Sequence, residues 1–468
     1  MQARTRALWR GGAGTTSMVL AAGLLTATPA HAHPTDTPTP ATVSGPLATT
    51  ADNYPFMSPA GPDVPPIDAG PSIEVDLDAH DYVEEEFLLE GTANHDNSDT
   101  GETGNSSPYT TRMVVRRPAD PDDASGSTFL EWNNVSFGQD IEINWSLSHD
   151  YFLRNGHVWV GLSAQRVGVE ALSQWNPDRY GDLDVGGPEL ADAPAFDIYT
   201  QAAQALREPP QGTDPLPGID THTLVATGHS QSARYLAEYH NTVHPRHEAI
   251  DAFMIHGANT ALDTPEGTPV MRLMAEGDVR SRASSAEPDT EYFRRWEVAG
   301  SSHVGYTEYR TFAPLIARDV PGTQPDQCDR PPLSRIPFHY PLNAAYDHLL
   351  DWAATGTAPP QAPRLDWDSA LTPSRDAHGN QLGGIRLQEH EAATARNDGN
   401  NSGDPFCFLQ GAHIPFDDDT LTEFYPNRGQ YRSAVNQALN TSKRDGYVLN
   451  ADARESRANA WEVRYDWW

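Results

Sequence analysis

Residues Thr223-Leu-Val-Ala-Thr-Gly-His-Ser-Gln-Ser-Ala-Arg-Tyr-Leu-Ala-Glu-Tyr239 decide the fold. A β-branched and apolar run leads into Gly228-His-Ser-Gln-Ser232, and a helical pattern follows. This order predicts a strand that turns sharply into a helix and exposes the hydroxyl of Ser230, the arrangement called a nucleophile elbow. The turn needs small residues on both sides of the serine; Gly228 meets that need, and Ser232 stands where a second glycine is usual. A plain strand–turn–helix is the alternative, but the flanking pattern favours a nucleophile.

A serine hydroxyl is a weak nucleophile, so it needs a general base, and the base needs an orienting acid. In folds with this elbow, the order along the chain is serine, acid, histidine. The strand pattern Pro269–Met274 ends in a loop with two carboxylates, Glu276 and Asp278. Either could orient an imidazole, and Asp278 has the better offset from the strand. One strand later, three small residues lead to His303, which is the predicted base.

The oxyanion of an acyl-transfer intermediate needs two hydrogen-bond donors. The first predicted donor is the backbone N–H of Gln231, at the start of the helix after Ser230. The second is expected in the loop 131–138, from the backbone N–H of Asn133 or of Asn134.

Strands and helices alternate over most of the remaining chain. Strand patterns at 128–132, 157–162, 223–227, 249–255, 269–274 and 295–298 are separated by helical patterns, which predicts a mostly parallel sheet covered on both faces. Two leading strand patterns, 81–91 and 109–117, lack helices and predict an antiparallel start. We expect a core over 72–354, preceded by a Pro/Thr-rich flexible segment or extended arm (33–71) and followed by a C-terminal extension (355–468) packed on it.

The first residues predict export. A basic start, an apolar run from Met18 to Leu25 and the small-x-small site Ala30-His-Ala32 are typical of a signal peptide over 1–32. No later segment approaches the roughly 20 apolar residues of a membrane helix. We therefore expect a secreted, extracellular protein, in which Cys328 and Cys407 form a disulfide.

The formal net charge of −33 argues against nucleic acid and anionic membranes as partners. Removal of the signal peptide, with Arg4, Arg6 and Arg10, would make the charge three units more negative. Lys443 is the single lysine, which fits a coding bias towards arginine, adaptation to salt, or both.

No metal or cofactor is expected. His240, His244 and His247 are close in sequence, but Pro245 interrupts the helix between them. No carboxylate at a matching offset completes the ligand set of a metal site. Two acidic segments, 96–102 and 397–404, do not fit a twelve-residue calcium loop and are interpreted as flexible loops.

The chain resembles a bacterial, actinobacterial-type family of secreted α/β-hydrolase domain proteins with a Gly-x-Ser-Gln-Ser elbow. The resemblance implies the α/β-hydrolase fold and a Ser/acid/His triad that includes Ser230 and His303. It leaves the acid open between Glu276 and Asp278, and it implies no substrate. The matching segments are Glu131–Ser136, Trp159–Val169, Trp175–Gly181, Gly228–Ser232, Arg295–His303, Pro359–Pro363 and Gly383–Arg386.

These observations predict a secreted serine hydrolase that cleaves a small-molecule or polymer carboxylic ester through an acyl-enzyme. An amidase or lactonase with the same site is the first alternative. A secreted binding protein that kept the fold without turnover is the second. The sequence does not predict the oligomeric state.

Overall fold

A computed structural model describes residues 40–67, 71–96, 103–208, 211–263, 267–322 and 326–462. The predicted signal peptide lies outside these residues. A ten-stranded sheet in the order β10-β9-β8-β7-β4-β5-β3-β2-β1-β6 forms the centre of the molecule. Its strands are β1 (Thr42–Ser44), β2 (Tyr82–Asp96), β3 (Thr103–Pro118), β4 (Ser127–Trp132), β5 (Val158–Leu162), β6 (Gln211–Gly212), β7 (Thr223–His229), β8 (Ala252–His256), β9 (Val270–Ala275) and β10 (Phe293–Val298).

The pairing of the strands confirms a mixed, mainly parallel sheet. Each neighbouring pair in the row β10-β9-β8-β7-β4-β5 is parallel. β3 pairs antiparallel with both β5 and β2. Strands β5, β8 and β9 are buried along their whole length. Such continuous burial is expected of parallel strands with helices on both faces. The structure therefore has the α/β-hydrolase fold.

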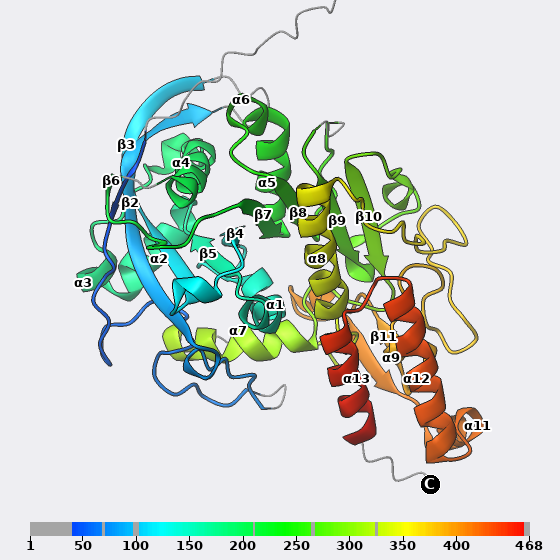
Figure 1. The fold of residues 1–468 in the computed structure, drawn as a ribbon. Helices are drawn as coiled ribbons and strands as arrows, with labels where there is room; N and C mark the ends of the chain where they lie inside the picture. Colours follow the sequence, from blue (N-terminus) through cyan, green and yellow to red (C-terminus); the bar gives the residue numbers. More distant parts are fainter. Residues whose placement is uncertain are drawn as a thin grey trace, which may run out of the picture. The chain divides into compact units, whose positions relative to one another are not determined.

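Helices cover both faces of the sheet (Figure 1). α1 (Ile143–Arg154) and α8 (His339–Thr355) pack against each other and on strands β7 to β9. α4 (Ala195–Arg207) and α5 (Gln231–Thr242) lie over β2, β4, β7 and β8. The short helices α2 (Arg166–Trp175), α3 (Pro177–Tyr180) and α6 (His244–His247) connect these elements. Within the described residues, no helix has the length and apolarity needed to cross a bilayer.

The helix α7 (Tyr306–Asp319) was not expected from the sequence. Pro314 lies inside it, and a proline is unusual in the interior of a helix. α7 packs on α1, directly after the loop that carries His303. It therefore forms a wall near the candidate site.

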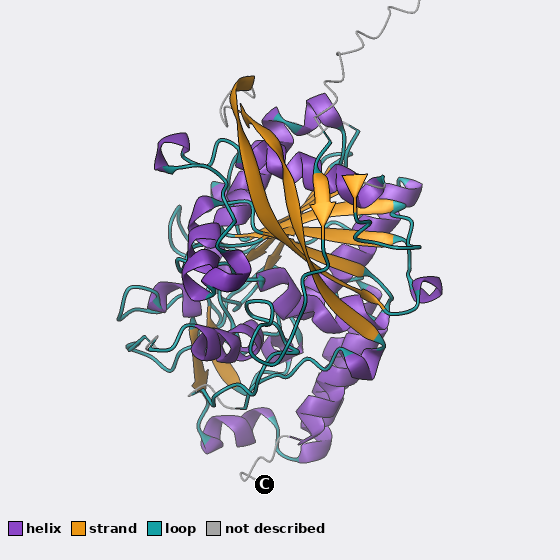
Figure 2. Cartoon of the chain, turned by 90° about the vertical axis from the view of Figure 1, so that its left-hand side faces the viewer, coloured by secondary structure: helices purple, strands orange, loops and turns teal. Residues whose placement is uncertain are grey.

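Residues 40–67 lie along the core. β1 pairs antiparallel with β2, and Val43, Phe56 and Met57 are buried. The long strands β2 and β3 form a twisted hairpin that crosses the direction of the shorter strands (Figure 2). Backbone contacts therefore fix part of the Pro/Thr-rich arm on the sheet.

The C-terminal extension builds on the β10 edge. Ile385 forms a parallel bridge with Val298, and Asp452 pairs with Arg154 of α1 (2.7 Å). The disulfide between Cys328 and Cys407, predicted from the cysteine count, is present. The elements of the extension are α9 (Gln388–Glu391), β11 (Ala395–Asp398), α10 (Cys407–Gln410), β12 (Ala412–Pro415), α11 (Asp418–Phe424), α12 (Arg428–Arg444) and α13 (Asn450–Glu462).

Candidate active site

Ser230 lies at a sharp turn between β7 and α5. Its backbone has φ 57° and ψ −115°, a strained conformation for a residue with a side chain. A Cβ atom at Gly228 would lie 3.1 Å from the Ser232 carbonyl carbon, so this position has little room for a side chain. The Ser232 hydroxyl accepts from the His229 N–H (3.1 Å) and donates to the His229 carbonyl (3.0 Å). Ser232 thus stabilises the turn with two hydrogen bonds that a glycine at this position could not form.

Asp278 and His303 are in direct contact. The Nδ1 atom of His303 lies 2.5 Å from Oδ1 of Asp278, and the Asp278 side chain is 4% exposed. Burial raises the pKa of the Asp278 carboxyl, but the charge and hydrogen bond of His303 outweigh this effect and lower it below its ordinary value. The carboxylate is therefore ionised and can only accept. His303 must donate from Nδ1, which leaves Nε2 free to accept a proton.

Glu276, the other acid candidate, has different partners. Its carboxylate pairs with Arg375 (2.5 Å) and accepts from the backbone N–H groups of Gly300 (2.7 Å) and Gly399 (3.4 Å). A Cβ atom at Gly399 would lie 2.5 Å from the Gly277 backbone nitrogen, so the two loops touch. Glu276 therefore connects the loop of Glu276 and Asp278 (276–278, called the acid loop below) to the C-terminal extension.

The tract 397–404 is not the flexible loop that its composition predicted. Asp398 pairs with Arg375 (2.9 Å) and with Arg330, and the Asn401 amide donates to the carbonyls of Arg330 (3.0 Å) and Gly411 (2.8 Å). These long-range partners could not be identified from local composition, and they order the tract against the acid loop.

A column of histidine rings places His303, the predicted base, beside the elbow. The His303 ring centroid lies 4.4 Å from that of His229, the residue before Ser230, and His229 lies 4.2 Å from His256. Burial, followed by the neighbouring histidines, lowers the pKa of His229 far below its ordinary value; burial lowers the pKa of His256 to about 3. Both rings are therefore neutral near pH 7. A Cβ atom at Gly257 (φ +70°) would lie 3.2 Å from His229 and 3.3 Å from His303, so glycine makes room for the column.

The loop after β4 does not offer the expected second oxyanion donor. The Asn133 N–H donates to the Leu162 carbonyl (3.2 Å), and the Asn134 N–H donates to the Ile141 carbonyl (3.1 Å). Both groups are already engaged, so the geometry does not support either as a donor to an oxyanion. The Asn134 side chain instead donates to the His229 carbonyl (2.8 Å) and fixes this loop against the elbow.

The first donor remains available by position. Gln231 begins α5, so its backbone N–H has no carbonyl of a preceding helical turn to bond. Its side chain donates to Gln165 (3.0 Å), which also accepts from the Trp132 indole (3.2 Å). Gln165 belongs to the segment 159–169 that carried the resemblance, and sequence reasoning gave it no role.

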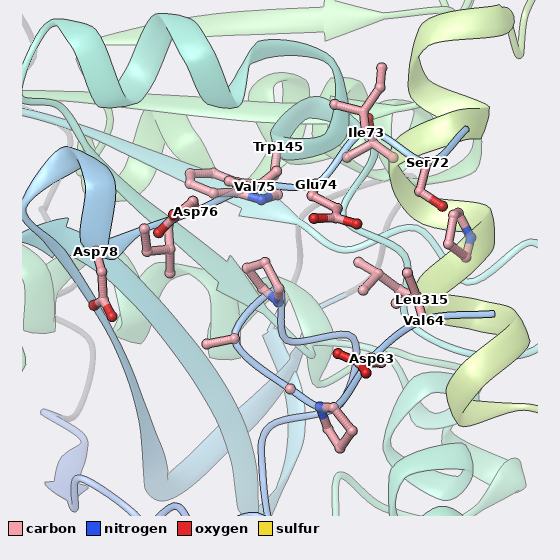
Figure 3. A pocket seen from close by; sticks show the side chains of 17 residues that line it. Asp63, Val64, Ser72, Ile73, Glu74, Val75, Asp76, Asp78, Trp145 and Leu315 are labelled. Atoms are coloured by element: carbon pink, nitrogen blue, oxygen red, sulfur yellow. The ribbon is translucent and has the colours of Figure 1, made fainter. Parts of the chain in front are cut away.

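Two cavities flank α7. One, of about 620 Å³, lies between the N-terminal arm, Trp145 and Leu315, and carboxylates of Asp63, Glu74 and Asp76 surround it (Figure 3). The other, of about 640 Å³, is lined by Ser136 and Val304, which lie close in sequence to Asn134 and His303. Across the described ranges, no cluster of three or more His, Cys, Asp or Glu side chains suits a metal ion.

The sequence pattern of the family described as "Alpha/beta hydrolase domain" matches residues 43–458. No curated protein matches the chain. Among solved structures, an α/β serine hydrolase without lid from Xanthomonas campestris is 14% identical (TM-score 0.29; 51% of this chain and 97% of that chain). A rice cell wall degrading esterase from Xanthomonas oryzae is 13% identical (TM-score 0.22; 37% and 42%). The glucuronoyl esterase from Solibacter usitatus is 9% identical (TM-score 0.26; 42% and 64%). Similarity at this level says nothing about the substrate.

Proposed function

Because this chain belongs to the alpha/beta hydrolase domain family, we propose that it is a secreted serine hydrolase that cleaves carboxylic esters. Ser230 is the nucleophile, His303 the general base and Asp278 the orienting acid. The observation that carries the proposal is the Asp278–His303 contact, with the His303 ring packed beside the left-handed turn at Ser230. A buried hydrogen bond between aspartate and histidine alone would be structural, but one built against a strained serine turn has the parts of a catalytic triad.

The chemistry follows from the protonation state of His303. The Ser230 oxygen bonds to the ester carbonyl carbon while its proton passes to Nε2 of His303. The Gln231 N–H donates to the oxyanion. Collapse of the intermediate breaks the bond to the alcohol oxygen, which takes the proton from His303. Water then attacks the acyl-enzyme, gives its proton to His303, and the Ser230 oxygen leaves with that proton.

Purified protein should hydrolyse p-nitrophenyl butyrate, whereas Ser230→Ala and His303→Ala should each lower kcat by several orders of magnitude at unchanged melting temperature. Ser433→Ala, an exposed serine of α12, is the matched control and should keep full activity. Near-normal activity of Ser230→Ala would refute the assignment. The butyryl anilide and butyrolactone test the reaction class, since faster turnover of either would make the protein an amidase or lactonase.

Secretion is part of the proposal. The predicted signal peptide supports it, as does the disulfide between Cys328 and Cys407, because disulfides persist in oxidising compartments. Expression of the full chain in a secreting host, followed by N-terminal sequencing, should give a mature protein in the medium that starts at His33. Retention of the whole chain in the cells would contradict this.

A further inference from the structure

The 640 Å³ cavity adjoins the candidate active site through two of its walls. Val304, in one wall, directly follows His303 in the chain. Ser136, in another wall, donates its N–H to the Asn134 side chain (2.8 Å), and that side chain donates to the carbonyl of His229, next to Ser230. The cavity is therefore linked to the loop of His303 through Val304 and to the elbow through the Asn134 side chain, and its volume of about 640 Å³ lies in the range of small-molecule sites.

The lining of this cavity is mainly apolar. Phe312, Ile316 and Val320 enter it from α7 and its C-terminal end, and Val304 and Leu409 close the side towards the base loop. Among the described residues of the lining, Asp326 is the one carboxylate, and it accepts from Gln410 (2.9 Å). Of the described residues that line the cavity, none is Arg, Lys or His. A charged anionic group would therefore find no countercharge, whereas a hydrocarbon group would be removed from water.

Two alanines on α7 create the space. Ala313 and Ala317, one helical turn apart, line the 640 Å³ cavity. Leu315 on the same helix lines the other cavity, of about 620 Å³, which the carboxylates surround and which is called the acidic cavity here. Residues four apart lie on the same face of a helix, so these two methyl groups share one wall. Larger side chains at positions 313 and 317 would fill the cavity from that wall.

Aromatic residues mark the outer edge of the cavity. The rings of Phe137, in the loop after β4, and Phe406, beside the disulfide, lie 4.8 Å apart. Phe406 is 38% exposed, and its neighbour Phe408 is 47% exposed. Among the described residues, the exposed large apolar side chains are Leu371, Phe406, Phe408 and Trp461, and Phe406 is the one of these four that lines the cavity. An exposed aromatic ring beside a mainly apolar lining favours an apolar ligand.

We propose that this cavity binds an uncharged hydrocarbon arm of the ester, so that the substrates are esters with a long apolar chain. This inference rests on the proposed serine-hydrolase function and names its substrate class. The backbone bond from the Val304 N–H to the Leu409 carbonyl (2.8 Å) joins the cavity wall to the base loop. Because of this link, the occupied cavity holds the substrate at the side of the site where His303 acts.

The test uses two series of esters at concentrations below micelle formation. The first extends the acyl group of p-nitrophenyl esters from acetate to decanoate, and the second extends the alcohol of acetate esters from methyl to decyl. In at least one series, kcat/KM should rise about two- to fourfold per methylene until the cavity is filled. A terminal carboxylate on the longest chain should remove this gain.

Substitutions on α7 locate the binding site. Ala317→Phe should abolish the gain for long chains and leave acetate hydrolysis within about threefold, because the reacting groups are untouched. Ala313→Val is a smaller change that should reduce the gain even if Ala317→Phe fails to fold. Leu315→Phe, which faces the acidic cavity, is the matched control and should keep the whole gain.

The outcomes separate this inference from the proposed function. If a fluorophosphonate labels Ser230 and acetate is hydrolysed, but neither series gains with length, the cavity is not the substrate site. A gain that survives in both alanine variants would also overturn the inference. If Ser230 is not labelled and no ester is hydrolysed, the proposed function fails, and this inference fails with it.

Discussion

Replacement of Asp278 by Asn should inactivate the protein without unfolding it. The two carboxylate oxygens of Asp278 have separate partners: Oδ1 faces Nδ1 of His303 (2.5 Å), and Oδ2 accepts from the Ala275 N–H (2.8 Å). An asparagine has one oxygen, and the Ala275 N–H can only donate. The amide oxygen will therefore bind Ala275, and the amide NH₂ will face His303.

The consequence is the wrong tautomer of His303. An NH₂ group that faces Nδ1 makes this atom an acceptor, so the proton of the neutral ring moves to Nε2. The base can then no longer take the proton of Ser230. The same change in a serine protease triad costs about 10⁴-fold in kcat, which corresponds to about 5 kcal/mol of transition-state stabilisation. We expect a loss of this order for Asp278→Asn.

The control for this substitution is Glu276→Gln. Its amide oxygen can still accept from Gly300, and Arg375 keeps Asp398 as a partner (2.9 Å). Stability should fall by about 1–2 kcal/mol, with kcat within about fivefold of the parent. Initial rates with p-nitrophenyl butyrate and thermal melts of both variants provide the test. A loss below tenfold for Asp278→Asn, or an equal loss for Glu276→Gln, would refute the assignment of the acid.

Three further predictions concern residues outside the triad. Gly257→Ala should lower kcat by about tenfold or more, because the new methyl group presses on His303. It should also lower the free energy of unfolding by about 1–2 kcal/mol, because alanine is strained at a positive φ. Unchanged kinetics would show that the column of histidine rings does not hold His303 in place. Burial lowers the pKa of His256, His339 and His390 to about 3, so the unfolded chain binds protons at these positions that the folded chain does not. The stability that these neutral histidines contribute is complete above the ordinary histidine pKa of about 6.5 and is lost as the pH falls towards 3. Burial raises the pKa of Glu131 and Glu308, so these two carboxyls lower stability as the pH rises above about 4.5 and have no effect below it. Melting temperature should therefore drop steeply between about pH 4.5 and 3.5, and an equal melting temperature at both values would contradict the burial argument. Finally, molar NaCl should raise the melting temperature relative to about 0.01 M salt, because it screens repulsion among charges that sum to −33. Sucrose, which stabilises proteins without screening charge, is the control. If NaCl does not raise the melting temperature, the case for adaptation to salt is removed.

The strand–turn–helix at Ser230 could be predicted because every signal for it is local. The apolar strand, the small residues of the turn and the helical pattern are contiguous from 223 to 239. The parallel sheet followed from similar local patterns. α7 was missed because Pro314 lies inside the helix, where a proline argues against helix from the sequence alone, whereas its packing on α1 is a tertiary contact.

The other details of the site depend on contacts between distant segments. Arg375 and Gly399, about a hundred residues further on, bind Glu276, whereas Asp278 contacts His303, and the proposal of Asp278 as the acid rests on these contacts. The donors expected at Asn133 and Asn134 are engaged because their loop folds back to Ile141 and onto β5. No spacing within the sequence could have indicated either outcome.

The most direct test of the account is covalent labelling of the native protein. A fluorophosphonate should add one equivalent to the folded chain, peptide mapping should find it on Ser230, and ester hydrolysis should stop in proportion. Labelling should vanish in Ser230→Ala and persist in Ser433→Ala. A label on a different serine, or hydrolysis that continues after Ser230 is fully labelled, would contradict the central claim that Ser230 is the activated nucleophile.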